Sequence, residues 1–226
     1  MLKPKMQLLC LMTSALLLGG CQAHTDKARH EENKPSEMKA SQLPKTRALQ
    51  DPFTREFLTS VKEVKKGYYP FQSKTKKYTM NFPVNAVISE LDYEQTNTQS
   101  EFISAGISYA DKSSASLDLT YDGGVMNADI KDELDYLKGK LQENVSFTKV
   151  ELNGRTLYWT PTYLNDSYYA YAGYVHPADG NGGVEMIYFS RCGKGNETCH
   201  NPNVEKKVQT NFYQLIETIK FKNPKD

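Results

Sequence analysis

The stretch that decides the fold is residues 145–163, VSFTKVELNGRTLYWTPTY. Asn153-Gly154 stands near its middle, and an Asn-Gly pair between two alternating runs is the strongest short signal for a tight β-hairpin. Residues 145–152 and 155–163 are therefore predicted to pair as antiparallel strands. A short turn can join only antiparallel strands, so this hairpin indicates an antiparallel sheet.

Segments on both sides of the hairpin extend the sheet and add two helices. Alternation of apolar and polar residues with period two predicts the other strands. These strands are expected at 78–82, 101–109, 116–121, 168–176 and 184–192. Two segments, 127–143 and 202–219, repeat their apolar residues with helical spacing instead, and the second helix runs on to Phe221. The prediction is a single α+β domain over residues 78–226, with an antiparallel sheet of about six to seven strands flanked by helices.

Four pieces of this pattern resemble the PsbP-like α/β/α sandwich family. The pieces are Tyr78-Thr-Met-Asn-Phe-Pro83, helix 127–143, residues 145–159 with Leu152-Asn-Gly154 at the turn, and the last helix running into Ile219-Lys-Phe221. They cover most of residues 78–222, as patterns of hydrophobicity and turns. The resemblance implies a fold and a binding or assembly role, and it implies no catalytic residue.

The first 21 residues resemble a type II lipoprotein signal peptide. Lys3 and Lys5 precede an apolar stretch at 8–18, which is eleven residues long and too short to span a bilayer. The stretch ends in Leu18-Gly19-Gly20-Cys21, where small residues precede the thiol that accepts the lipid. Residues 1–20 are therefore expected to be removed, and Cys21 to become the lipid-bearing first residue. An ordinary secretory signal with a chance cysteine is the alternative.

Residues between this cysteine and the domain are polar and basic. Residues 21–50 hold too few large apolar groups to offset the entropy of ordering, and are expected to form a flexible tether. Residues 51–77 are expected to hold a helix over 51–66 and a linker, and whether they dock on the domain is open. Residues 21–77 carry thirteen Lys or Arg against seven Asp or Glu, whereas 78–226 carry thirteen against twenty. A basic tether suits an anionic membrane surface, although a merely solvated linker would have the same composition.

Cys192 and Cys199 are the cysteines left once Cys10 has been removed with the signal and Cys21 lipidated. Outside the cytoplasm, two such thiols predict a disulfide. A metal site formed with His200 is the alternative, but the segment has no CxxC pair and no clear fourth ligand.

No motif for catalysis or cofactor binding stands out. His176 and Asp179 could pair as a base and its orienting acid, although a histidine at a strand end is also an ordinary turn residue. The loop 179–183 begins like a calcium loop but lacks an acid at its twelfth position. We therefore expect no cofactor and no metal. Aromatic residues crowd the strands between 155 and 192, and the residues expected to form a partner surface are Tyr158, Tyr163, Tyr169 and Tyr171, unless they pack in the core.

The function expected from these observations is that of a non-catalytic binding or assembly module, held outward-facing on a bacterial cell membrane, with a Gram-positive envelope preferred. Its partners would be the membrane, through Cys21, and a protein or other envelope component. Nucleic acid is not an expected partner, because the domain is acidic. The alternatives are an envelope hydrolase or enzyme accessory with an unrecognised site, and a surface protein that excludes phage or foreign DNA.

A bridge between Cys192 and Cys199 closes an eight-residue loop, and should stabilise the mature protein by about 2.5 kcal/mol in the chain-entropy model. Mass spectrometry of the non-reduced, exported protein should find neither thiol open to alkylation. Two freely alkylated cysteines would exclude the bridge.

Overall fold

The computed structural model describes residues 34–123, 129–141, 144–165, 168–178, 182–191 and 202–222. The helical elements are η1 (Pro35–Glu37), η2 (Ala40–Gln42), α1 (Arg47–Gln50), α2 (Pro52–Arg55), α3 (Ile130–Leu141) and α4 (Pro202–Ile216). The strands are β1 (Tyr68–Gln72), β2 (Tyr78–Pro83), β3 (Ala86–Ile88), β4 (Glu94–Thr96), β5 (Ser100–Ser108), β6 (Ser114–Asp122), β7 (Thr148–Leu152), β8 (Arg155–Asn165), β9 (Tyr168–Pro177), β10 (Gly183–Arg191) and β11 (Lys220–Phe221). No helix in the described ranges is long and apolar enough to cross a membrane.

The main sheet has eight strands and is antiparallel throughout. Its order is β3-β5-β6-β10-β9-β8-β7, with β4 also paired to β5. The predicted hairpin is β7–β8, in which Leu152 pairs with Arg155 around a turn where Gly154 adopts a φ of 73°. The antiparallel sheet with flanking helices is thus confirmed, and it is larger than the six to seven strands expected.

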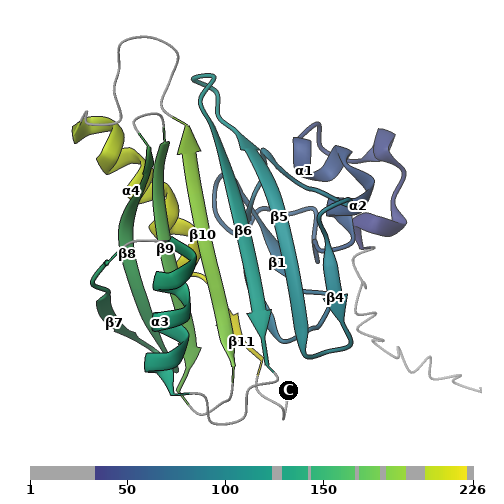
Figure 1. The fold of residues 1–226 in the computed structure, drawn as a ribbon. Coiled ribbons are helices and arrows are strands. Elements are labelled where there is room, and N and C mark those ends of the chain that lie inside the picture. The colour runs from purple at the N-terminus through teal and green to yellow at the C-terminus, as the bar shows by residue number, and fades with distance from the viewer. Residues whose placement is uncertain are drawn as a thin grey trace, which may run out of the picture. The chain divides into compact units, whose positions relative to one another are not determined.

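Helices lie on both faces of the main sheet (Figure 1). On β9, Tyr171 and Ala172 point to opposite faces because side chains alternate along a strand. Tyr171 stacks on Phe212 of α4, with ring centroids 5.4 Å apart. Ala172 clusters instead with Leu137 and Leu141 of α3. The sheet therefore lies between α3 on one face and α4 on the other.

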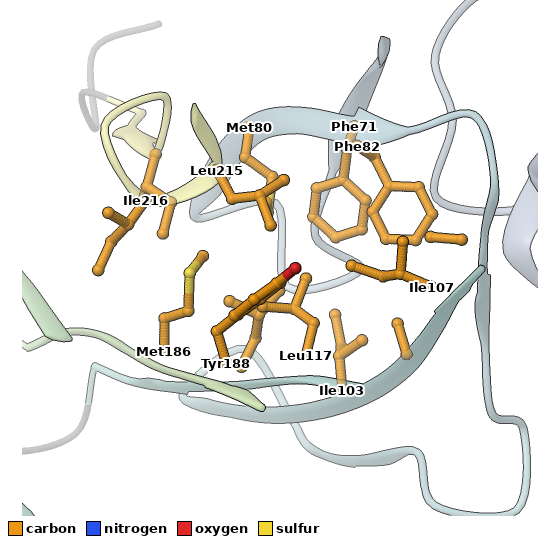
Figure 2. Packing of buried hydrophobic residues seen from close by; sticks show 14 of the residues in the cluster. Phe71, Met80, Phe82, Ile103, Ile107, Leu117, Met186, Tyr188, Leu215 and Ile216 are labelled. Carbon is orange, nitrogen blue, oxygen red and sulfur yellow. The ribbon is translucent and has the colours of Figure 1, made fainter. Parts of the chain in front are cut away.

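A second, three-stranded sheet of order β1-β2-β11 shares the α4 side. Its apolar side chains point at those of the main sheet, as Figure 2 shows for Phe71, Met80 and Phe82 facing Ile103 and Leu117. All five are buried, so the main core lies between the two sheets.

The structure differs from the tether and linker expected before residue 78. Residues 34–50 were expected to belong to a flexible tether, but Leu43, Ala48 and Leu49 are buried in the core. The helix expected at 51–66 is the single turn α2, and part of the expected linker is strand β1. These few apolar side chains suffice because the main sheet provides a surface for them to cover, which composition alone does not reveal. Residues 51–77 therefore do dock on the domain.

A buried carboxylate fixes the turn between β1 and β2. Glu101 on β5 is 1% exposed and accepts hydrogen bonds from the Lys74 backbone N–H at 2.8 Å, the Thr75 hydroxyl at 3.3 Å and the Tyr93 hydroxyl at 3.1 Å. Burial raises the pKa of Glu101, and these hydrogen bonds oppose the rise. The turn is therefore attached to β5 through a polar contact in the core.

The Lys74 side chain joins the same turn to α2. Its Nζ lies 4.3 Å, 4.8 Å and 4.9 Å from the ring centroids of Phe53, Phe57 and Tyr93, and 2.7 Å from a carboxylate oxygen of Glu56. An ammonium near the faces of aromatic rings is attracted by their quadrupoles. Lys74 thus stabilises the packing of the N-terminal segment on the second sheet.

Helix α4 packs on β9 at Gly173, where a side chain would not fit. A Cβ there would lie 2.4 Å from Cδ1 of Ile216, 3.1 Å from Cζ of Phe212 and 3.1 Å from the backbone oxygen of Tyr158. Glycine therefore permits the close approach of helix and sheet.

Gly173→Ala should lower the free energy of unfolding by about 1–3 kcal/mol, because the added methyl must displace α4. Gly106→Ala is the matched control, since a Cβ on that exposed glycine of β5 meets nothing within 4 Å. The control should be neutral, or stabilise by up to about 1 kcal/mol through the unfolded state. Urea unfolding of both variants measures the difference, and equal stabilities would show that α4 does not depend on this contact.

Candidate functional site

A pocket of about 470 Å³ opens where α4 meets the ends of both sheets. It lies between the β1 and β2 ends of the small sheet and the turn joining β5 to β6. Its lining residues are Gly67, Tyr68, Pro83, Val84, Asn85, Ser108, Tyr109, Ala110, Asn211 and Leu215. The walls are partly apolar, with hydroxyl and amide groups among them, which is the usual composition of a small-ligand site.

Tyrosine hydroxyls supply most of the polar chemistry around this pocket, which we call the tyrosine pocket. The Tyr68 hydroxyl donates to Oε1 of Gln214 at 2.8 Å. The hydroxyls of Tyr109 and Tyr188 share a hydrogen bond of 2.6 Å, and Tyr188 also bonds the Asn211 side chain. Strands β1 and β10, the β5–β6 turn and helix α4 thus hold these phenols together.

These phenols are neutral at physiological pH. Burial is the largest cause of the shift at Tyr188, whose pKa is raised to about 12. Burial also raises the pKa of Tyr109, with further contributions from Tyr188, and that of Tyr68, with a further contribution from Glu217. A neutral phenol donates and accepts hydrogen bonds but is a poor general base. The described residues that line the pocket include no Asp, Glu, His or Cys. The described lining thus offers neutral hydroxyl and amide groups beside apolar walls.

Cations stand at the rim of the tyrosine pocket. Arg47 donates from Nη1 to the Ser108 hydroxyl at 2.8 Å. Lys65 and Lys207 each place Nζ 5.7 Å from a ring centroid, over Tyr68 and Tyr109 respectively. Lys207 also pairs with Asp111, and hydrogen bonds from Lys207 and then Ser113 lower the pKa of that carboxyl. Glu63 accepts a hydrogen bond from the Gly67 N–H at 2.6 Å, so the rim has both charge signs.

The four tyrosines expected to form a partner surface do not come together. Tyr169 and Tyr171 are each 2% exposed and belong to the core. Tyr158 is half-buried, and alternation places it on the face of β8 opposite Leu157 and α4. The Tyr163 side chain lies outside the described part. Two of the four are thus core residues, because α4 covers the face of the sheet on which they lie.

The other residues singled out in the sequence give no second site. His176 shares a hydrogen bond of 3.1 Å between Nδ1 and the Gly182 oxygen, as expected of a turn residue, and Asp179 lies outside the described ranges. Cys21, Cys192 and Cys199 also lie outside them. Among the described residues, no group of three or more His, Cys, Asp or Glu is placed to hold a metal ion.

Sequence analysis missed the residues of the tyrosine pocket. Tyr68 lies in the segment expected to be a linker, and Tyr109 ends a predicted strand without any motif around it. Asn211 lies on the predicted C-terminal helix, where it lacks the apolar character used to identify that helix. The only available signal was aromatic density, which pointed to the neighbouring strands instead.

Comparison with known proteins identifies relatives of this chain. A family model described as "Putative lipoprotein YvcA" matches residues 44–220. A Bacillus subtilis (strain 168) protein of the same description is 28% identical over 239 aligned positions, covering 96% of each chain. Among solved structures, aphrodisin, a sex pheromone from female hamster, aligns with 72% of this chain and 85% of its own, at 15% identity and a TM-score of 0.14. That score is too low to support any structural argument. The family match extends from before α1 to Lys220, where β11 begins, and includes the tyrosine pocket, so the chain belongs to the YvcA lipoprotein family.

Proposed function

We propose that this protein is a membrane-anchored lipoprotein of the bacterial envelope, and that its domain is a non-catalytic binding module whose ligand site is the tyrosine pocket. One observation carries the choice of binding over catalysis. The titratable groups among the described lining residues are tyrosines, and their pKa values are raised. Their hydroxyls can orient a polar group of a ligand, while Val84 and Leu215 provide apolar contact.

The lipobox supports the anchor. Leu18-Gly19-Gly20-Cys21 follows an apolar stretch of signal-peptide length, and the matched family is one of lipoproteins by description. Cys21 would then carry the lipid, including palmitate-like acyl chains, after removal of residues 1–20. Two acyl chains bind a bilayer almost irreversibly, at about 0.8 kcal/mol per buried CH₂. The protein would face outward from the cell membrane, and the Bacillus relative favours a Gram-positive envelope.

The finer fold assignment is also part of the proposal. The PsbP-like α/β/α sandwich is supported by a sheet with α3 on one face and α4 on the other. The second sheet beside α4 is an addition to the elements from which that resemblance was recognised. Members of that fold family mostly bind or assemble, which agrees with a binding role here.

Filling the tyrosine pocket should abolish ligand binding without unfolding the domain. Ala110→Trp places a large ring at the exposed turn that lines the pocket. Ala178→Trp is the matched control, because the strand register puts Ala178 at the opposite end of the main sheet. Photo-crosslinking and affinity capture from intact membranes should recover an envelope component with wild type and control, but not with Ala110→Trp. Melting temperatures should agree among all three, since surface substitutions usually cost under about 0.5 kcal/mol. Equal capture by Ala110→Trp would exclude the pocket, and chemical turnover of the captured component would show an enzyme.

Replacement of Cys21 tests the anchor separately. Cys21→Ser removes the thiol that accepts the diacylglyceryl group, so the variant should take up no labelled fatty acid and should fail to mature normally. Wild-type protein should incorporate the label and partition into detergent. A wild-type protein found in the medium with an unmodified Cys21 would contradict the anchor.

A further inference from the structure

The outer layer of the domain on the α4 side is strongly basic. This basic layer consists of residues 60–83 and 217–222, which form β1, β2, β11 and the turns at their ends. Its exposed lysines are Lys62, Lys65, Lys66, Lys76, Lys77, Lys220 and Lys222. Its exposed carboxylates are Glu63 and Glu217, which leaves a net charge of +5 from seven lysines and two glutamates.

Strand register gathers three of these lysines on one surface. Lys220 pairs with Thr79, and the Lys222 N–H donates to the Lys77 oxygen at 2.9 Å. Alternation turns Tyr78 and Phe221 towards the core and leaves the three lysine side chains outward. Like charges on neighbouring strands destabilise a sheet. The stability of the sheet therefore does not explain why these lysines lie together, whereas binding of an anionic partner would.

A shallow groove crosses the same surface and adds neutral donors. It has a volume of about 530 Å³ and is lined by Thr59, Pro70, Phe71, Gln72, Thr79, Met80, Asn81, Glu217, Thr218, Lys220 and Lys222. Ammonium, hydroxyl and amide groups are the donors that phosphate oxygens accept from in proteins. Glu217 is the carboxylate among these lining residues. The groove thus suits phosphate groups better than cationic ones.

The opposite face of the main sheet has the opposite charge. Its carboxylates, on α3 and on the strands beneath, are Asp118, Asp122, Asp129, Asp132, Glu133, Asp135 and Glu185. Its lysines are Lys131, Lys138 and Lys140, and Arg191 on β10 lies beside Asp118, so these seven carboxylates and four cations give a net charge of −3. A domain polarised in this way would turn its basic layer towards any nearby anionic surface.

The anchor supplies such a surface at short range. Cys21 precedes Lys34 by thirteen residues, which span at most roughly 45 Å at 3.3–3.6 Å per residue. A surface tethered so closely has a high effective concentration, so even weak contacts suffice for docking. We propose that the basic layer docks on the anionic bilayer to which Cys21 is attached, with α3 turned away from the membrane. This inference rests on the proposed lipid anchor.

Lysine labelling of the acylated protein tests the docking. The protein is reconstituted into vesicles of phosphatidylcholine alone, or of phosphatidylcholine with phosphatidylglycerol, and treated with an amine-reactive reagent before mass spectrometry. Lys76, Lys77, Lys220 and Lys222 should react severalfold more slowly in the anionic vesicles, whereas Lys131 and Lys138 on α3 should react equally in both. Salt at about 0.5 M should remove the difference, because it screens exposed charges.

Charge reversal supplies matched variants. Lys77→Glu/Lys220→Glu/Lys222→Glu should lower the ratio of docked to undocked protein at least about a hundredfold, since each lysine lost near an anionic leaflet contributed about 1 kcal/mol and each new carboxylate is repelled by it. Lys62, Lys65 and Lys66 should then be labelled in anionic vesicles as fast as in neutral ones. The control Lys131→Glu/Lys138→Glu/Lys149→Glu changes the net charge equally on other elements and should keep the protection. Melting temperatures check that both variants are folded.

Flotation of the vesicles separates failure of the docking from failure of the anchor. Protein that floats with both vesicle types, but shows the same labelling in each, would overturn the docking and leave the anchor intact. Protein that does not float would overturn both. A third sample contains neutral vesicles and soluble polyphosphate. If the lysines of the basic layer are labelled more slowly there than with phosphatidylglycerol vesicles, the layer binds an anionic polymer and membrane docking is overturned.

Discussion

The close approach of α4 to β9 at Gly173 is the constraint on which most of this domain depends. It seats Phe212 and Ile216 against the sheet, and the chain that follows is buried at Ile219 before it enters β11. The position of α4 therefore determines where β11, the third strand of the second sheet, begins. The same helix contributes Asn211 and Leu215 to the tyrosine pocket. The close contact at Gly173 thus helps to place the α4 residues of the pocket and strand β11 at the edge of the basic layer.

The second sheet is stable because it is packed, not because of its own hydrogen bonds. Two- and three-stranded sheets are marginal in water unless a hydrophobic face is covered. Here Phe71 stacks at 5.6 Å on both Phe57 and Phe82, between the N-terminal segment and the main sheet. The polar contacts of Glu101 and the cation–π contacts of Lys74 then fix the turn that ends at Lys77. These contacts therefore attach the turn that carries Lys76 and Lys77 to β5 and to α2.

Local sequence signals predicted the elements that are long enough to show a full hydrophobic repeat in their own sequence. The hairpin at Asn153-Gly154, the long strands and both long helices are of this kind. Strands β1, β3, β4 and β11 were missed because they have two to five residues, too few for alternation to be recognised, and β1 contains Pro70. The tyrosine pocket could not be predicted for a different reason. Its lining residues come from β1, the end of β2, the β5–β6 turn and α4, and the Tyr188 hydroxyl that bonds Tyr109 comes from β10, which pairs with β6. That pairing joins strands about 70 residues apart, and no local pattern specifies it.

With the proposed lipid on Cys21, the packing of residues 34–50 would set the distance between the domain and the membrane. Ordering the backbone of one residue costs about 1–2 kcal/mol of entropy. A segment with this many polar residues would therefore be expected to stay unfolded. Burial of Leu43, Ala48 and Leu49 offsets this cost, together with the Ala48 N–H bond to the Val84 oxygen at 3.1 Å and the Arg55 bond from Nη1 to the Met38 oxygen at 2.9 Å. A tether running from Cys21 to residue 50 could reach roughly 100 Å, whereas one ending at Lys34 reaches less than half of that. A lipid-anchored domain with the shorter connection stays near the bilayer, where the field of an anionic surface can orient it. The apolar residues of this polar segment therefore contribute to stability, and with the proposed anchor at Cys21 they would also limit how far the domain can move from the membrane.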